Sequence, residues 1–126
     1  MMKINKTFLV ILWVWIFALF IFTQRVEGRV LTKKGGINTF EGHQESWYNL
    51  KMTKVIQRAQ ANGITGVYWE NADGLKMYGS YIIVAANYDI YPYGSLVNTS
   101  RGMGIVLDTG EFIKKNPIMI DLAVAW

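Results

Sequence analysis

The sequence lacks cysteine altogether and has only two prolines and one histidine. Without cysteine, no disulfide can brace the fold and no thiolate can bind a metal. One histidine is too few for a histidine metal cluster, and no phosphate-binding or dinucleotide-binding glycine motif is present. We therefore expect neither a metal nor another cofactor. The fold must depend on a packed apolar core, and hydrophobic residues make up 52% of the chain.

The excess of positive over negative charge is also small. The net charge is +4, from 13 basic and 9 acidic residues. Half of this excess comes from residues 1–28, where Lys3, Lys6 and Arg25 stand against Glu27. The remainder of the chain therefore has too small a positive excess to support the basic footprint of a nucleic-acid-binding protein. We expect no nucleic acid among the partners.

The longest apolar run lies at the N-terminus. Phe8–Phe22 contains no charged residue and follows Lys3 and Lys6, which is the order found in secretory signals. The run is shorter than the roughly 20 residues that span a bilayer. We expect residues 1–28 to be a signal peptide or membrane anchor, which leaves open whether the segment is removed. The protein would then be secreted or membrane-anchored outside the cytoplasm, and would meet the membrane only through this segment.

The rest of the sequence predicts a polar, glycine-containing linker at residues 29–42 and a β-rich domain at residues 43–126. A short helix capped by Thr53 is expected through Gln60, with Asn62-Gly63 as its stop. Residues 71–74, Asn-Ala-Asp-Gly, are a hairpin signal. Short strands around one helix favour a small closed barrel. The expected strands are His43–Leu50, Val67–Glu70, Leu75–Tyr78, Tyr81–Ala86, Leu96–Thr99, Ile105–Leu107 and Ile118–Ala123.

Several short motifs occur in a fixed order in this domain. They are Ser46-Trp47-Tyr48, Val84–Ala86 followed by Asn87, Tyr91–Gly94, Ile105–Gly110 with its Asp-Thr-Gly end, and Met119–Asp121. Their order resembles the three-aspartate (3D) domain and the related rare lipoprotein A-like proteins, double-psi β-barrels of bacterial cell-wall proteins. The resemblance covers most of residues 43–126. Asn87 departs from it, because the family has an aspartate there.

The resemblance implies an all-β fold, a six-stranded double-psi β-barrel with one short helix. It also implies action on peptidoglycan glycan strands in the manner of a lytic transglycosylase. That reaction needs one carboxylic acid, which protonates the glycosidic oxygen and then accepts a proton from the sugar 6-hydroxyl. Asp121 is the expected acid/base, kept protonated by burial and by repulsion from Asp108. Asp108 would orient the substrate or stabilise developing positive charge.

Four further residues are expected to bind the substrate, and the protein is expected to be a monomer. Asn87, at the position of the missing acid, would hydrogen-bond the sugar or the carboxyl pair. Tyr93 could stack on a sugar ring, and Glu45 could face the cleft from the first strand. Thr109 lies next to Asp108 and would also contact the glycan.

Four alternatives stand beside this interpretation. Asp108-Thr109-Gly110 also occurs in aspartic proteases, but residues 111–126 lack the glycine that such a chain needs after the motif. Asp108 could simply cap a turn, and Asp121 could lie on the solvent side of the last strand. The whole domain could also bind glycan or another envelope component without cleaving it, which the loss of one acid at Asn87 favours.

Overall fold

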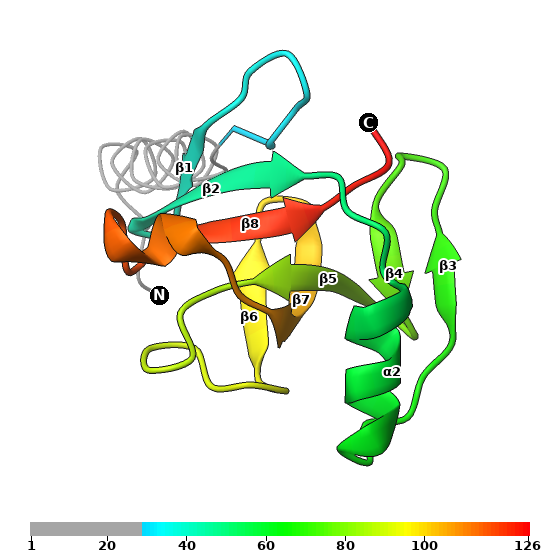
Figure 1. The fold of residues 1–126 in the computed structure, drawn as a ribbon. Helices are drawn as coiled ribbons and strands as arrows, with labels where there is room; N and C mark the ends of the chain where they lie inside the picture. The colour runs from blue at the N-terminus through cyan, green and yellow to red at the C-terminus, as the bar shows by residue number, and fades with distance from the viewer. Residues whose placement is uncertain (1–28) are drawn as a thin grey trace, which may run out of the picture.

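The computed structural model describes residues 29–126, and the expected signal or anchor segment lies outside this range. The described chain is mostly β-strand, so the all-β class is confirmed (Figure 1). None of its helices has the length and apolarity needed to span a bilayer. Its elements are β1 (Asn38–Phe40), β2 (His43–Tyr48), α2 (Thr53–Ala61), β3 (Tyr68–Glu70), β4 (Lys76–Tyr78), β5 (Tyr81–Ala85), β6 (Leu96–Thr99), β7 (Gly102–Asp108), the 3-10 helix η1 (Glu111–Lys114) and β8 (Ile120–Ala123).

The helix and the hairpin follow from local signals. α2 buries Val55 and Ala59, which lie four residues apart and so share one face. It ends at Asn62, followed by Gly63 with a φ of 76°, as the Asn-Gly stop predicts. The predicted cap was wrong: Thr53 is the first helical residue, and Met52 precedes it without a side-chain cap. β3 and β4 pair antiparallel around residues 71–74, which confirms the predicted hairpin.

The predicted linker at residues 29–42 is corrected by the structure. Within it, Asn38–Phe40 forms β1 and pairs antiparallel with β2. Leu31 is only 1% exposed and belongs to the main core. This segment therefore packs onto the domain, because burial of Leu31 and pairing of β1 stabilise it against the domain surface. With β1, the sheet has eight strands, whereas local patterns predicted seven and the resemblance implied a six-stranded barrel.

The sheet is built around β5. This strand pairs antiparallel with β4 and with β8, and in parallel with β7. β8 is also paired in parallel with β2, and β6 lies antiparallel on β7. Figure 1 shows β2 and β8 running side by side, with α2 standing beside β4. The strands β2, β7 and β8 therefore lie around the C-terminal end of β5, although all three are distant from it in sequence.

The hydrogen-bonded ladder of the described chain is open, with β1 at one end and β6 at another. Side chains connect these ends. Ser100, in the turn between β6 and β7, donates through its backbone N–H and its hydroxyl to the Glu45 carboxylate on β2. The Ser100 hydroxyl also accepts from the Leu31 N–H at 2.9 Å, and Arg101 Nε donates to the Leu31 carbonyl at 2.8 Å. The sheet therefore curls enough to bring both ends into contact.

Two apolar layers stabilise the sheet. The larger one lies on the face that Leu31 covers, and the smaller one fills the space between the sheet and α2. Alternation along each strand determines which layer a residue joins, since neighbouring side chains of a strand point to opposite faces. Leu122 belongs to the first layer and Ala123 to the second. Asp121 therefore shares the α2-facing side with Ala123.

Replacing Glu45 with alanine should destabilise the domain by about 1–3 kcal/mol, because the partly buried donors of Ser100 and Asn38 would lose their acceptor. The Glu45 side chain is 0% exposed, and it accepts from Ser100 and from the Asn38 amide at 2.9 Å. Urea unfolding measures the change. Glu70→Ala is the matched control, because this exposed carboxylate accepts only from the Tyr68 hydroxyl. Equal unfolding midpoints for the two variants would contradict a structural role for Glu45.

Candidate functional site

The sheet places two aspartates on either side of Ala85. Asp108, at the end of β7, and Asp121, on β8, are both paired in register with Ala85 on β5. Residues paired directly across neighbouring strands project from the same face. Strands lie about 4.8 Å apart, so the two Cα atoms are separated by roughly 10 Å. Ala85, which lies between the two aspartates, is only 2% exposed.

A β-bulge brings Asp108 into this row. The register of β5 on β7 shifts between Val84, which pairs with Val106, and Ala85, which pairs with Asp108. In a regular ladder without the bulge, Ala85 would oppose Leu107. The Asp108 side chain would then point to the other face. Bulges of this kind often re-aim a side chain beside an active site. The placement of Asp108 therefore depends on one irregularity in the strand.

The Asp108 carboxylate is buried and fully engaged. Its residue is 9% exposed. The Tyr48 hydroxyl donates to Oδ2 at 2.9 Å, and the Thr109 N–H donates to Oδ1 at 2.9 Å. Each oxygen therefore accepts one hydrogen bond from the protein. Asp108 is thus held as a hydrogen-bond acceptor in a fixed orientation.

Asp121 lies in a different environment. Its Oδ1 is buried and has no hydrogen-bond partner among residues 29–126. Burial raises the pKa of Asp121 from 3.8 to about 6, because the charged form loses hydration without a compensating donor. Desolvation alone accounts for this rise, so the expected contribution of repulsion from Asp108 is not required. Asp121 therefore keeps its proton up to a pH of about 6, well above the range of an ordinary aspartate.

Tyrosines surround the pair. Burial, followed by the Asp108 charge and its hydrogen bond, raises the pKa of Tyr48 far above its ordinary value, so the phenol remains a donor. The Asp121 charge acts on Tyr48 in the same direction, which places both carboxyl groups near this hydroxyl. Burial also raises the pKa of Tyr88, with Asp108 adding to the effect and Arg58 opposing it. Tyr88 packs edge-on against Tyr93, with ring centroids 5.6 Å apart.

The remaining predicted residues divide between the site and the rest of the fold. Asn87 follows β5 beside Asp108, but its Oδ1 accepts from the Asp89 N–H at 3.0 Å and so stabilises its own turn. Thr109 is exposed next to Asp108. The Tyr93 hydroxyl is buried without a partner in the described chain. Glu45 lies elsewhere: it pairs with Ile120 and binds Ser100, so the structure does not bring it to the aspartates.

A pocket opens beside Asp108, and sequence reasoning missed its cationic lining. It lies along α2 and the segment that precedes it, and its volume of about 580 Å³ is in the range of ligand-binding pockets. The sequence shows Lys54 and Arg58 four residues apart on the predicted helix, but it gave no sign that this face borders Asp108. The lining residues are Leu50, Lys51, Thr53, Lys54, Val55, Gln57, Arg58 and Asp108.

The site has the groups for proton transfer and not those for holding a metal. Within residues 29–126, no cluster of three or more histidine or acidic side chains could bind a metal ion. What the site does offer is one carboxyl group, that of Asp121, whose pKa of about 6 suits it to proton transfer.

Comparison with protein-family models, with curated proteins and with solved structures found no match to this chain. The chemistry of the site therefore has to be argued from its own geometry.

Replacing Asp121 with asparagine should stabilise the domain at pH 7 and leave its stability almost unchanged at pH 4. In the folded state the carboxyl group binds its proton more tightly than in the unfolded state, since its pKa is about 6 rather than 3.8. Wild-type stability therefore falls as the pH rises from about 4 to about 6 and then levels off. The neutral amide avoids this loss, which we expect to be on the order of 1 kcal/mol because water partly screens the group.

Urea unfolding at pH 4 and pH 7 measures this difference. Asp89→Asn, at an exposed position, is the control and should change stability equally at both pH values. A gain for Asp121→Asn that is the same at pH 4 and pH 7 would show that burial does not hold the proton on this group.

Proposed function

We propose that this protein is an exported peptidoglycan-acting enzyme that cleaves glycan strands in the manner of a lytic transglycosylase. The observation that carries the proposal is the pair of aspartates flanking Ala85, one buried without a donor and the other held by Tyr48 and Thr109. Unequal environments for two neighbouring carboxyl groups are typical of acid–base sites that cleave glycosidic bonds. Release of soluble muropeptides from purified sacculi tests the proposal.

In this mechanism Asp121 performs both proton transfers. Its carboxylic acid donates a proton to the glycosidic oxygen, and the bond between that oxygen and C1 breaks. The 6-hydroxyl oxygen of the same sugar then bonds to C1, and its proton returns to the Asp121 carboxylate. Asp108, oriented by Tyr48 and Thr109, stabilises the positive charge that develops at C1. No water is consumed, so no second group is needed to activate one.

Three residues beside the aspartates supply the proposed substrate contacts. The Tyr93 ring packs against Tyr88 and would stack on a sugar ring, whereas its hydroxyl is buried. Thr109 is exposed beside Asp108. Asn87 keeps its amide nitrogen for the glycan, since only its oxygen serves the turn. We omit Glu45 from this set, because its carboxylate is occupied by Ser100 and Asn38.

We also propose that the domain is a divergent double-psi β-barrel of the 3D or rare lipoprotein A-like type. Two features support this. Strand pairs β2–β8 and β5–β7 are parallel, although the other pairs are antiparallel. The ends of the sheet are connected by Ser100, Glu45, Leu31 and Arg101. In this proposal, side chains rather than a further backbone ladder close the barrel.

The alternative is a barrel that binds glycan without cleaving it. Asn87, which stands where the resembling family has an acid, favours this alternative. Binding alone would leave sacculi intact while the protein sediments with them. A variant that still sediments but releases no muropeptides would not separate the two possibilities, so the wild type must be measured first.

Export is the next expected result. In cells that carry the full chain, the protein should be found in the membrane or outside fraction, because residues 8–22 are uncharged and apolar and follow two lysines. A chain that starts at Arg29 should stay in the cytoplasmic fraction. Fractionation followed by immunoblotting measures both. Full-length protein in the cytoplasm would contradict export.

A further inference from the structure

The pocket beside Asp108 is lined by cations that have no acidic partner. Lys51, Lys54 and Arg58 are exposed around it. The single ion pair of the described chain joins Lys114 to Glu111, which lie elsewhere. α2 has no acidic residue in its first turn, and no side chain caps it. None of these three cations therefore forms an ion pair within residues 29–126.

Asp108 lines the same pocket but forms no ion pair with these cations. Both of its oxygens are engaged, one by the Tyr48 hydroxyl and the other by the Thr109 N–H. Arg58 acts on the neighbouring Tyr88, whose pKa it lowers against the larger effect of burial. The Arg58 guanidinium thus lies close to Tyr88, which is itself near Asp108. An anion bound by Arg58 and Lys54 would lie next to the glycan that the aspartates contact.

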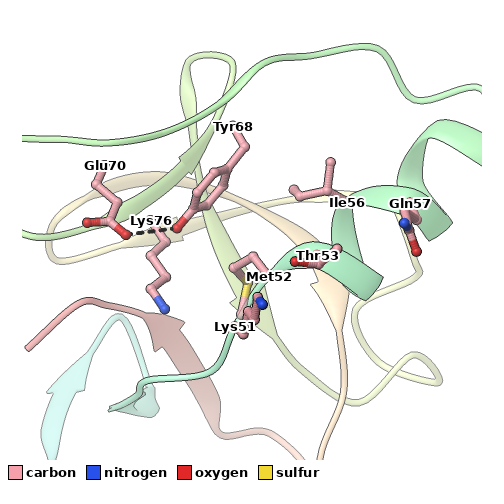
Figure 2. Close-up of a pocket in the computed structure, with 8 residues that line it drawn as sticks. All are labelled: Lys51, Met52, Thr53, Ile56, Gln57, Tyr68, Glu70 and Lys76. Atoms are coloured by element: carbon pink, nitrogen blue, oxygen red, sulfur yellow. Dashed lines mark hydrogen bonds between the residues drawn. The ribbon is translucent and has the colours of Figure 1, made fainter.

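A second pocket adjoins the first along α2. It shares Lys51, Thr53 and Gln57 with the first pocket. Figure 2 shows Lys76 in this pocket next to Glu70, which is hydrogen-bonded to Tyr68. Lys76 is only 5% exposed, and its Nζ donates to Asn49 Oδ1 at 2.8 Å and to the Leu50 carbonyl at 2.6 Å. This lysine fixes the segment that carries Lys51 into the start of α2.

We infer that the pocket beside Asp108 binds the free carboxylates of the peptide stems that peptidoglycan carries on its glycan strands. This inference rests on the proposed function. The stem branches from the same sugar ring that is cleaved, so a glycan over Asp108 and Asp121 directs its peptide into the adjoining pocket. Arg58 offers a planar fork that matches a carboxylate, and Lys54 adds a point charge one helical turn away. Leu50 and Val55 supply apolar lining for the short side chains of the stem.

The consequence is a preference for glycan that still carries its peptides. The full-length chain is tested on soluble glycan strands with tetrapeptide stems and on the same strands after an amidase has removed the stems. We expect a lower KM for the stem-bearing strands. In the Lys54→Ala/Arg58→Ala double variant this KM should rise about tenfold, as expected for two solvent-exposed ion pairs. Added salt should reduce the wild-type preference, because it screens the ion pairs.

The control is Lys33→Ala/Lys34→Ala, which removes the same charge from an exposed loop far from the pocket in sequence. It should keep the wild-type preference. Equal KM values of the wild type for both substrates, or a preference that survives in the Lys54/Arg58 variant, would overturn the inference and leave glycan cleavage standing. If the wild type binds strands without cleaving them, Kd from titration replaces KM with the same expectations. A wild type that neither cleaves nor binds either substrate overturns both this inference and the proposed function.

Discussion

Asp121→Asn should lower the rate of muropeptide release by about 10²–10⁴, the usual loss when a general acid is removed. The amide has nearly the same shape as the acid but cannot donate the required proton. The pKa of about 6 predicts that wild-type activity also declines as the pH rises above 6, when Asp121 becomes ionised. The measurement is the initial rate on purified sacculi across pH 4–8, with unfolding curves to show that the variant is folded.

Asp108→Asn is the companion variant. It keeps one acceptor oxygen for Tyr48 but loses the negative charge, so the rate should fall by less than for Asp121→Asn. The two losses should be less than additive in the double variant, because residues that act as one unit lose their joint contribution at the first substitution. Wild-type rates for Asp121→Asn would show that this carboxyl group is not the acid.

Leu122→Ala should cost about 2–5 kcal/mol of stability, the largest effect on folding that we expect from a single substitution. Leu122 is 0% exposed and is paired with Trp47 on β2 and with Val84 on β5. Truncation therefore opens a cavity in the main core at the strand that joins the two halves of the sheet. Because Asp121 precedes it, the same substitution should also loosen the site.

Leu96→Ala is the matched control for this prediction. Leu96 lies on the edge strand β6 and is 50% exposed, so its truncation should change stability by about 0.5 kcal/mol or less. Urea unfolding of both variants gives the comparison. Similar losses at the two positions would contradict the assignment of Leu122 to the core.

Local patterns in the sequence predicted much of the fold. Alternating or continuous apolar residues indicated β2, β5, β6 and β8, and residues 71–74 indicated the β3–β4 hairpin. Local patterns could not predict β1, because Asn38–Phe40 lies in a polar segment and is a strand only through its pairing with β2. They also gave the wrong helix cap, since Met52 precedes α2 and the helix is stabilised by packing of Val55 and Ala59 instead.

The candidate site was predicted less completely than the fold. The motif order indicated Asp108 and Asp121, but the register that aligns both with Ala85 depends on strand pairing between distant segments. The bulge at residue 107 leaves no mark in the sequence. The hydrogen bond from Tyr48 to Asp108 joins residues 60 positions apart, so no local pattern could pair them. In the sequence, Lys54 and Arg58 look like ordinary cations of a solvated helix face. Only the fold shows that they line a pocket beside Asp108.

Mass spectrometry of the products that the purified full-length protein releases from sacculi tests the central claim most directly. Transfer of the glycosyl bond to the sugar's own 6-hydroxyl predicts fragments that end in a 1,6-anhydro sugar, each lighter by one water than a hydrolysis product. The wild type should release such fragments, and Asp121→Asn should release almost none. Fragments that end in a reducing sugar, or no fragments from the folded wild type, would contradict the proposal that Asp121 cleaves glycan strands by intramolecular transfer.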